Sequence, residues 1–401
     1  MRSNIEIENF ISVSDQLVPS DFFDIRFKMR NANLLIVSPN SRANQTKKIN
    51  RGFVNSGCCK SIKILAFDRD EGKASDISYQ SLGTIFRCRY FSRIINVIRA
   101  IWITSKEMSN NDVVFTWTLD CLIITLLAKL FSRNKQLKVL YNVRDIHPQL
   151  TKKTLFSVLL RRVDKIVSRY VDVFVFTSPY YFTGYYNGIL KISDIKWVVL
   201  ENKVPEELWE KIKRPSSEHY DRQGITIGYF GLMAYKNSWE IIKDIVQSKS
   251  SNVKFYLRGH NYLGDYFENE LKSCSNVEYG GFYKNPEDLS SMFDKIDISW
   301  AINAENYTPN TNDQWAMCNR FYEGLYFKKP LIVQKGSAHS DFVETYDIGV
   351  CVDARNAQET KNIILNITTA DIARWKKNID KIDDSIFILS KSEYSKIMDV
   401  L

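Results

Sequence analysis

The stretch WAMCNRFYEGLYFKKPLIV, residues 315–333, joins a group of polar side chains to a short helix and then to a buried strand. Asn319 and Arg320 open the predicted helix, and Glu323 follows about one turn later. The segment KKP ends the helix, because basic residues suit the negative end of a helix and proline cannot continue one. The apolar LIV that follows predicts a short buried strand.

Two of these polar side chains suit a charged ligand. An arginine at a helix N-terminus can bind a phosphate, because its guanidinium adds to the amides that point at the ligand there. A carboxylate one turn further on can accept hydrogen bonds from the vicinal hydroxyls of a sugar, as the acidic residue of dinucleotide sites does. The alternative is an ordinary amphipathic helix whose Glu323 is solvated.

Length and charge set the outer bounds. A chain of 401 residues, 44% of them hydrophobic, is long enough for two ordinary domains. Its formal net charge of +9 favours an anionic partner. The basic residues are scattered and no nucleic-acid-binding signature occurs, so we expect a phosphorylated substrate or an anionic membrane surface and no nucleic acid.

Cysteine usage and hydropathy indicate the compartment. The seven cysteines are odd in number and form no CxxC pair, which favours buried free thiols in a reducing compartment. The N-terminal MRSNIEIENF carries acids where a signal peptide would be basic and then apolar. No apolar run reaches the roughly 18 residues of a membrane span. We therefore expect a cytoplasmic protein.

Strands alternate with helices along the first half of the chain. Strands are predicted at residues 33–37, 62–67, 113–117, 138–142, 173–176 and 197–200, with helices at 93–105, 119–132 and 155–170. Several of these strands are apolar on both faces, which is typical of a parallel sheet covered by helices.

The alternation restarts after the polar stretch 211–224, KIKRPSSEHYDRQG, which reads as a linker. Strands are predicted at 225–230, where Gly231 breaks the strand, and at 253–257, 277–279, 296–301, 331–333 and 349–352. We predict two doubly wound, Rossmann-like α/β domains, 1–210 and 225–380, that face a central ligand-binding cleft. A C-terminal segment, 381–401, is expected to return as a helix to the first domain.

The order and spacing of several motifs resemble the bacterial glycosyltransferases of the GT-B architecture, family 4 in particular. IGYFG with the following Lys236 resembles the opening of that family's nucleotide domain, and VKFYLRGH resembles its second strand and glycine turn. VEYGGFYKNPEDL is similar to the nucleobase segment, and CNRFYEGLYFKKPLIV to the helix that binds diphosphate and ribose. YNVRDIHP and VVLENKVP resemble two strands of the first domain.

The chain also departs from the family pattern. Glu323 matches the second of the family's paired glutamates, but Ala316 stands in place of the first. Leu232 and Met233 stand where an arginine is expected after IGYFG. Arg320 matches a basic residue of a subgroup that acts in surface-polysaccharide assembly. The donor and the diphosphate contacts therefore stay open.

The resemblance implies transfer of a sugar from a nucleotide-sugar donor, of UDP or GDP form, to a glycan acceptor on a lipid. The product would belong to a capsule, an O-antigen or another surface polysaccharide. Donor-binding residues would be Gly231, Lys236, Arg258, Tyr283, Asn319, Arg320 and Glu323, and the acceptor would meet Asp145 and His147. Each of these residues also has an ordinary alternative role. Lys236 would be a solvated loop lysine, Arg320 part of a surface ion pair and Tyr283 a core residue. Asp145 and His147 would cap a turn in the first domain.

The chemistry implied needs neither metal nor cofactor. Lys236 and Arg320 would meet the charge that grows on the departing diphosphate. Family members of this kind retain the anomeric configuration, and the departing phosphate then helps to deprotonate the acceptor, so that Asp145 could serve only to orient it. The acidic pair of Asp68 and Asp70 suits a hard cation, but it lies in the wrong half for the nucleotide site, and we predict no metal site there.

Two segments of the first half bear on membranes. RIINVIRAIWITSK, residues 93–106, and LFSVLLRRVDKIVSRY, residues 155–170, mix apolar and basic residues at helical spacing. Such faces can lie on anionic lipid, although a core-packing helix with a basic outer face explains each of them as well. Peripheral contact with the inner face of the plasma membrane is therefore an expectation.

Two rival functions share these features. One is a GT-B-type nucleotide-sugar epimerase, which would need acid and base carboxylates clustered at the cleft. The other is a catalytically silent subunit that binds a partner glycosyltransferase, for which the missing first glutamate leaves room.

Overall fold

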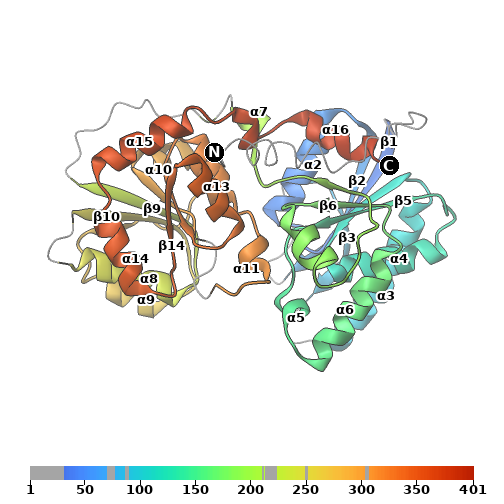
Figure 1. The fold of residues 1–401 in the computed structure, drawn as a ribbon. Helices are drawn as coiled ribbons and strands as arrows, with labels where there is room; N and C mark the ends of the chain where they lie inside the picture. The colour runs from blue at the N-terminus through green and yellow to red at the C-terminus, as the bar shows by residue number, and fades with distance from the viewer. Residues whose placement is uncertain are drawn as a thin grey trace. The chain divides into compact units, whose positions relative to one another are not determined.

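The computed structural model describes residues 31–69, 77–85, 90–209, 212, 224–248, 252–302 and 307–401. The arm expected before residue 33 and most of the expected linker lie outside these ranges. The chain divides into two compact units, Met1–Glu201 with Lys391–Leu401, and Asn202–Ser390 (Figure 1). No helix within the described residues is long and apolar enough to cross a membrane.

The first unit is built on a seven-stranded sheet of order β3-β2-β1-β4-β5-β6-β7 in which every paired neighbour is parallel. Its strands are β1 Ala32–Ser38, β2 Cys59–Arg69, β3 Gln80–Ile85, β4 Val113–Trp117, β5 Lys138–Val143, β6 Val173–Phe176 and β7 Trp197–Val199. Its helices are α2 Asn44–Ser56, α3 Tyr90–Met108, α4 Leu119–Phe131, α5 Pro148–Thr151, α6 Leu155–Ser168, the π-helix Tyr181–Asn187 and α16 Lys391–Asp399.

Burial explains why the sequence predicts the central strands well. Every residue of β4 and of β6 is buried, as expected for a parallel sheet covered on both faces. Strand β3 was not predicted, because QSLGTI has no apolar run and only Leu82 and Gly83 in it are buried. The prediction of a parallel α/β sheet is confirmed.

The helices cover the two faces of this sheet in separate groups. From β1 the chain moves one way to β2 and β3, and from β4 it moves the other way, so right-handed connections place α2 on one face and α3, α4 and α6 on the other. Helix α16 packs against α2, with Tyr394 edge-to-face against Phe53 at 5.1 Å between ring centres (Figure 1). Gly52 makes room for this contact, because a Cβ there would lie within 2.4 Å of the Tyr394 ring.

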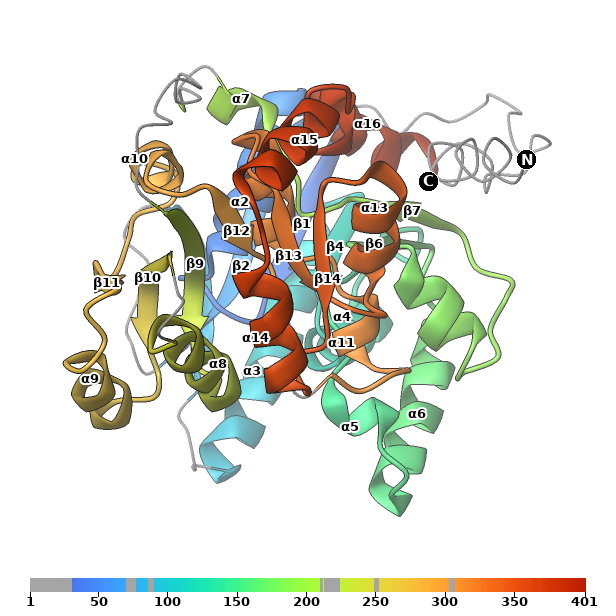
Figure 2. The same cartoon turned by 60° about the vertical axis from the view of Figure 1, so that its left-hand side comes forward.

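The second unit repeats the parallel design with six strands in the order β11-β10-β9-β12-β13-β14. Its strands are β9 Ile225–Met233, β10 Val253–Asn261, β11 Val277–Tyr279, β12 Ile298–Trp300, β13 Leu331–Gln334 and β14 Gly349–Val352. Its main helices are α8 Lys236–Val246, α9 Asp265–Leu271, α10 Leu289–Asp294, α11 Asn312–Trp315, α12 Asn319–Tyr326, α13 Ala338–Tyr346, α14 Ala357–Leu365 and α15 Thr369–Ile379. Helices α8 and α14 pack side by side (Figure 2).

The second unit begins at Asn202, ahead of the expected linker. The short strand β8, Val204–Pro205, pairs with β15, Ile388–Leu389, and so ties the segment to this unit. Asn202 Nδ2 also donates to the carbonyl of Met317 at 3.1 Å, and Tyr326 Oη donates to the carbonyl of Ile212 at 2.9 Å.

Strand β9 does not break at Gly231 as predicted, but continues to Met233. Gly231 pairs with Gly259 of β10, and both have a positive φ, +128° and +139°. These angles keep the two strands paired while their backbones approach closely, which only glycine allows without strain.

Replacing Gly259 by alanine should therefore destabilise the second unit severely. A Cβ there would lie 1.6 Å from the Gly231 carbonyl oxygen, so we expect a loss of more than about 4 kcal/mol in the free energy of unfolding. Gly231→Ala is the matched control, because no atom of the described residues lies within 4 Å of its added Cβ and only backbone strain of about 1–3 kcal/mol remains. Urea denaturation measures both, and equal midpoints for the two variants would contradict the argument.

Candidate active site

The candidate site of the second unit lies where its strand order reverses. Strands β9 and β12 are neighbours in the sheet, but the chain runs from β9 toward β11 and from β12 toward β14. Ligands of such sheets bind outside the carboxyl ends of the strands at this switch point. The predicted motifs reach this edge from the end of β9, the loop after β12 and the start of α12.

Helix α12 starts in a fixed position although no side chain caps it. The backbone N–H of its N-cap residue, Cys318, donates to Nε2 of His339 at 2.9 Å. His339 is buried on α13, so its imidazole holds the start of one helix against another. Asn319, the first residue of α12, is exposed.

Arg320, the second residue of α12, is held by backbone carbonyls and by an aromatic ring. Its guanidinium donates to the carbonyls of Ile302 at 2.8 Å and Trp300 at 3.4 Å, and it lies over the Tyr229 ring at 5.1 Å. Burial alone would lower the pKa of Arg320, but Cys318 and three nearby tyrosines together raise it. These partners differ from the surface ion pair considered as the alternative.

Glu323 is buried, so it is not the solvated residue of an ordinary amphipathic helix that was the alternative to a ligand-binding carboxylate. Its side chain is 7% exposed, and Oε1 accepts a hydrogen bond from Asn285 Nδ2 at 3.1 Å. Burial raises the pKa of the Tyr283 hydroxyl, Glu323 raises it further, and Arg320 and Arg258 act against this. The predicted residues Tyr283, Arg320, Glu323 and Arg258 are thus brought within electrostatic reach of one another.

Arg258 shapes the loop that carries Tyr283. Its guanidinium donates to the carbonyls of Phe282 at 2.7 Å and Gly281 at 3.1 Å, and to the Tyr256 hydroxyl at 3.1 Å. A weaker ion pair to Asp288 spans 3.4 Å. Arg258 therefore fixes the conformation of the loop 280–288.

Gly231 and Lys236 flank the end of β9. The space beside Gly231 is open, since no protein atom among the described residues lies within 4 Å of a Cβ built there. Lys236 is the first residue of α8, and its Nζ lies 4.7 Å from the centre of the Tyr266 ring of α9. The structure does not place Lys236 among the contacts of Arg320.

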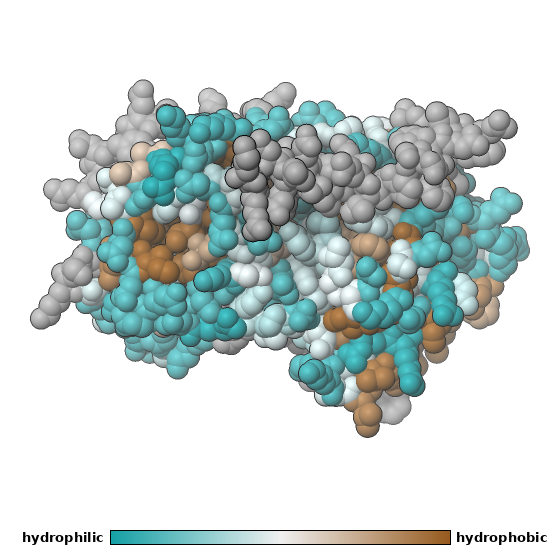
Figure 3. Space-filling model, in the orientation of Figure 1, coloured by the Kyte–Doolittle hydropathy of each residue, from teal (hydrophilic) through white to brown (hydrophobic). Residues whose placement is uncertain are grey.

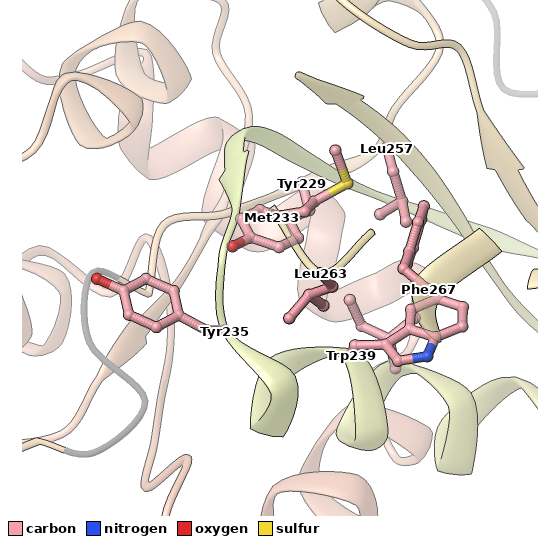
Figure 4. Close-up of a pocket in the computed structure, with 8 residues that line it drawn as sticks. Tyr229, Met233, Tyr235, Trp239, Leu257, Leu263 and Phe267 are labelled. Atoms are coloured by element: carbon pink, nitrogen blue, oxygen red, sulfur yellow. The ribbon is translucent and has the colours of Figure 1, made fainter. Parts of the chain in front are cut away.

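A small hollow lies beneath the start of α8 (Figure 4). It is lined by Tyr229, Met233, Tyr235, Trp239, Ile242, Leu257, Leu263 and Phe267. The Tyr229 hydroxyl is already used, since it donates to the carbonyl of Leu232 at 2.8 Å. The lining is otherwise almost wholly apolar, so the hollow belongs to the packing under α8 and is no seat for a charged ligand.

In the first unit, Asp145 and His147 follow β5, and both are exposed. His147 Nδ1 accepts from the backbone N–H of Gln149 at 3.2 Å and so caps α5, which is the turn-capping role weighed as its alternative. Arg144 lies between them and the sheet. Burial lowers its pKa while Asp145 raises it, and its Nε is buried without a hydrogen-bond partner in the described structure.

Asp68 has a structural role. Its buried carboxylate accepts hydrogen bonds from the hydroxyls of Tyr79 at 2.5 Å, Ser81 at 2.6 Å and Ser41 at 3.0 Å. It therefore ties together the segments around β1, β2 and β3. Asp70 lies outside the described residues, and within those that are described no group of three His, Cys, Asp or Glu side chains could hold a metal ion.

Three contributors to the site were not predicted: Asn285, His339 and Tyr229. Asn285 lies within the quoted VEYGGFYKNPEDL, so the motif that resembles a nucleobase segment contained the signal. Tyr229 likewise lies within IGYFG. Nothing in the sequence near His339 indicates that its ring meets the start of α12.

Two parallel, doubly wound sheets joined in one chain are the GT-B architecture that the sequence predicts. Residues 233–391 match the family model of the glucosyltransferase 3-like C-terminal domain. The succinoglycan biosynthesis protein ExoL of Rhizobium meliloti (strain 1021) is 21% identical over 320 residues, which cover 78% of each chain.

Solved structures show the same fold. Anabaena HepE, in complex with UDP and glucose, superposes with a TM-score of 0.66 at 14% identity over 92% of this chain and 98% of that one. Sucrose-phosphate synthase from Thermosynechococcus elongatus gives 0.62 at 11% identity, over 92% and 95%. The resemblance to GT-B glycosyltransferases of surface-polysaccharide assembly is confirmed.

Proposed function

We propose that the chain transfers a sugar from a nucleotide-sugar donor to a lipid-linked glycan acceptor, at the inner face of the plasma membrane, during assembly of a surface polysaccharide. The observation that carries the proposal is the fixed cation Arg320 and the buried carboxylate Glu323 on one turn of α12, at the switch point of the second sheet. The relative's role in succinoglycan biosynthesis and the UDP and UDP-glucose bound to HepE support it.

The second unit would bind the donor. Arg320 and the first amides of α12 would bind the diphosphate, with Lys236 at the start of α8 and the open backbone at Gly231 beside it. Glu323 would accept hydrogen bonds from the ribose hydroxyls, and the loop that carries Tyr283 would meet the base. Asn285 would hold the Glu323 carboxylate in place for the ribose.

The first unit would bind the acceptor, with Asp145 and His147 to orient its hydroxyl. The bond from the anomeric carbon to the diphosphate oxygen breaks, and the acceptor oxygen bonds to that carbon on the same face. The acceptor proton passes to the departing diphosphate, and the attack on the same face retains the configuration. Protein cations and backbone donors meet the leaving-group charge without a metal.

A thermal-shift screen against UDP, GDP, ADP, CMP and dTDP tests the donor site. A ligand that binds only the folded chain stabilises it by about 2.7 kcal/mol at a hundredfold excess over Kd. We expect one diphosphate to raise the melting temperature, equally with magnesium and with EDTA. The shift should vanish in Arg320→Ala and Glu323→Ala and persist in Arg374→Ala, an exposed position on α15.

The outcomes separate the rival functions. No shift with any nucleotide, from a folded protein, would favour the silent subunit. An isomerised donor in place of free nucleoside diphosphate after incubation would identify an epimerase. A shift that requires magnesium would overturn the metal-independent mechanism.

A further inference from the structure

The helices α3, α4 and α6 of the first unit expose a concentration of large hydrophobic side chains. Of the eighteen exposed large hydrophobic residues in the described part of the chain, thirteen lie on these helices or just beyond α6. The most exposed on each helix are Trp102 of α3 at 74%, Phe131 of α4 at 71% and Leu155 of α6 at 92%. Figure 3 shows brown side chains reaching the surface at its lower right, over α6. Exposed apolar side chains that gather in one region mark interaction sites, whereas singly scattered ones do not.

These side chains lie on neighbouring helices. Helix α3 packs against α4, and α4 packs against α6, on the face of the sheet opposite α2. The inner side of each helix carries buried residues such as Ala100, Ala128 and Ser157. The exposed residues therefore belong to the outer side. We call the outer side of α3, α4 and α6 the three-helix surface. The core-packing reading of the two amphipathic segments therefore accounts only for their inner sides.

Cations stand among the apolar side chains. Arg162 on α6 and Arg169 at its C-cap are exposed at spacings of three or four residues from Leu159 and Ile166. Further exposed cations are Arg99 and Lys106 on α3, Arg133 after α4, and Lys152 and Lys153 before α6. None of these seven forms a salt bridge within the part of the chain that the structure describes.

The carboxylates of these helices do not neutralise that charge. Asp164 of α6 is buried and accepts from the Tyr185 hydroxyl at 2.7 Å. Glu107 of α3 pairs with Lys63 at 2.7 Å. Asp120, in the first turn of α4, is exposed, so one exposed carboxylate on these helices stands against seven exposed cations.

We propose that the three-helix surface binds anionic phospholipid bilayers, with its apolar side chains in the interface and its cations on the lipid headgroups. Amphipathic helices with this composition lie in the membrane plane, and exposed Trp and Tyr side chains such as Trp102 and Tyr170 suit the headgroup level. A symmetric contact between two copies fits less well, because it would place the same unneutralised cations against each other. The proposal concerns the first unit alone and does not depend on the donor site.

Co-sedimentation of the full chain with vesicles tests this proposal. We expect binding to vesicles made of phosphatidylglycerol and phosphatidylcholine in equal amounts at 0.1 M salt, where the Debye length is about 10 Å. Binding to vesicles of pure phosphatidylcholine should be much weaker. The double variant Arg162→Glu/Arg169→Glu should lower the partition coefficient by at least about 25-fold, since each cation near an anionic surface contributes on the order of fivefold. Lys377→Glu, an exposed position on α15, is the charge control.

The apolar part needs its own variant. Trp102→Ser/Leu155→Ser should also weaken binding to the mixed vesicles, while Val54→Ser, exposed on α2 of the opposite face, should not. Absence of wild-type binding to the mixed vesicles would overturn the proposal. Equal binding by all variants would overturn it as well. If the serine variants change the oligomeric state in solution and leave lipid binding unchanged, the surface is a protein interface and the proposal is wrong. Nucleotide-induced thermal shifts of the same variants should match those of the wild type, which separates this result from a failure of the donor site.

Discussion

Replacing Arg320 by alanine is expected to lower turnover by about 10²–10³-fold, the effect of removing one preorganised donor from a developing anion. In the proposed reaction negative charge grows on the departing diphosphate. The guanidinium is already fixed by the carbonyls of Ile302 and Trp300 and by the Tyr229 ring, so it need not reorganise as the bond breaks.

The same substitution leaves two carbonyls without their donor, which costs stability of about 1–3 kcal/mol. Activity must therefore be measured well below the melting temperature of the variant. Arg320→Lys separates the two effects, because lysine keeps the charge but lacks the planar fork that reaches both carbonyls. We expect Arg320→Lys to recover part of the turnover. Turnover of Arg320→Ala within about threefold of the wild type would contradict the assigned role, given the expected magnitude.

The sequence predicts those parts of the fold in which local pattern and burial agree. Strands β4 and β6 are apolar on both faces and lie fully buried, and α12 begins and ends where its polar opening and its KKP segment indicate. Strand β3 was missed because its residues are mostly small or polar. The break predicted at Gly231 was wrong, because the glycine serves the close approach of β10 and not a turn.

The candidate site was predictable where its residues sit on one motif and hidden where they meet through packing. Arg320 and Glu323 share a helix, so spacing alone brings them together. His339 reaches Cys318 because α13 packs beside α12, and β8 joins the second unit through its pairing with β15 and its contacts with α12. Such contacts join residues distant in the chain and leave no periodicity to read.

Replacing Glu323 by glutamine is expected to weaken nucleoside diphosphate binding by about 10- to 100-fold, because a hydrogen bond to a charged acceptor contributes about 1.5–3 kcal/mol and 1.4 kcal/mol corresponds to about a factor of ten. Glutamine keeps the volume and one carbonyl oxygen, so Asn285 retains an acceptor and the helix stays packed. What it loses is the carboxylate that would accept both ribose hydroxyls.

Isothermal titration with the diphosphate found in the thermal-shift screen measures the loss. Glu344→Gln, exposed on α13, is the matched control and should bind as the wild type does. If Glu323 reads the ribose, the 2′-deoxy form of the same diphosphate should bind wild type more weakly and the Glu323→Gln variant about equally well. A variant that still distinguishes the two sugars would show that another group contacts the 2′-hydroxyl. Asn285→Ala should lie between wild type and Glu323→Gln in affinity, because it removes one hydrogen bond that positions the carboxylate and leaves its charge in place.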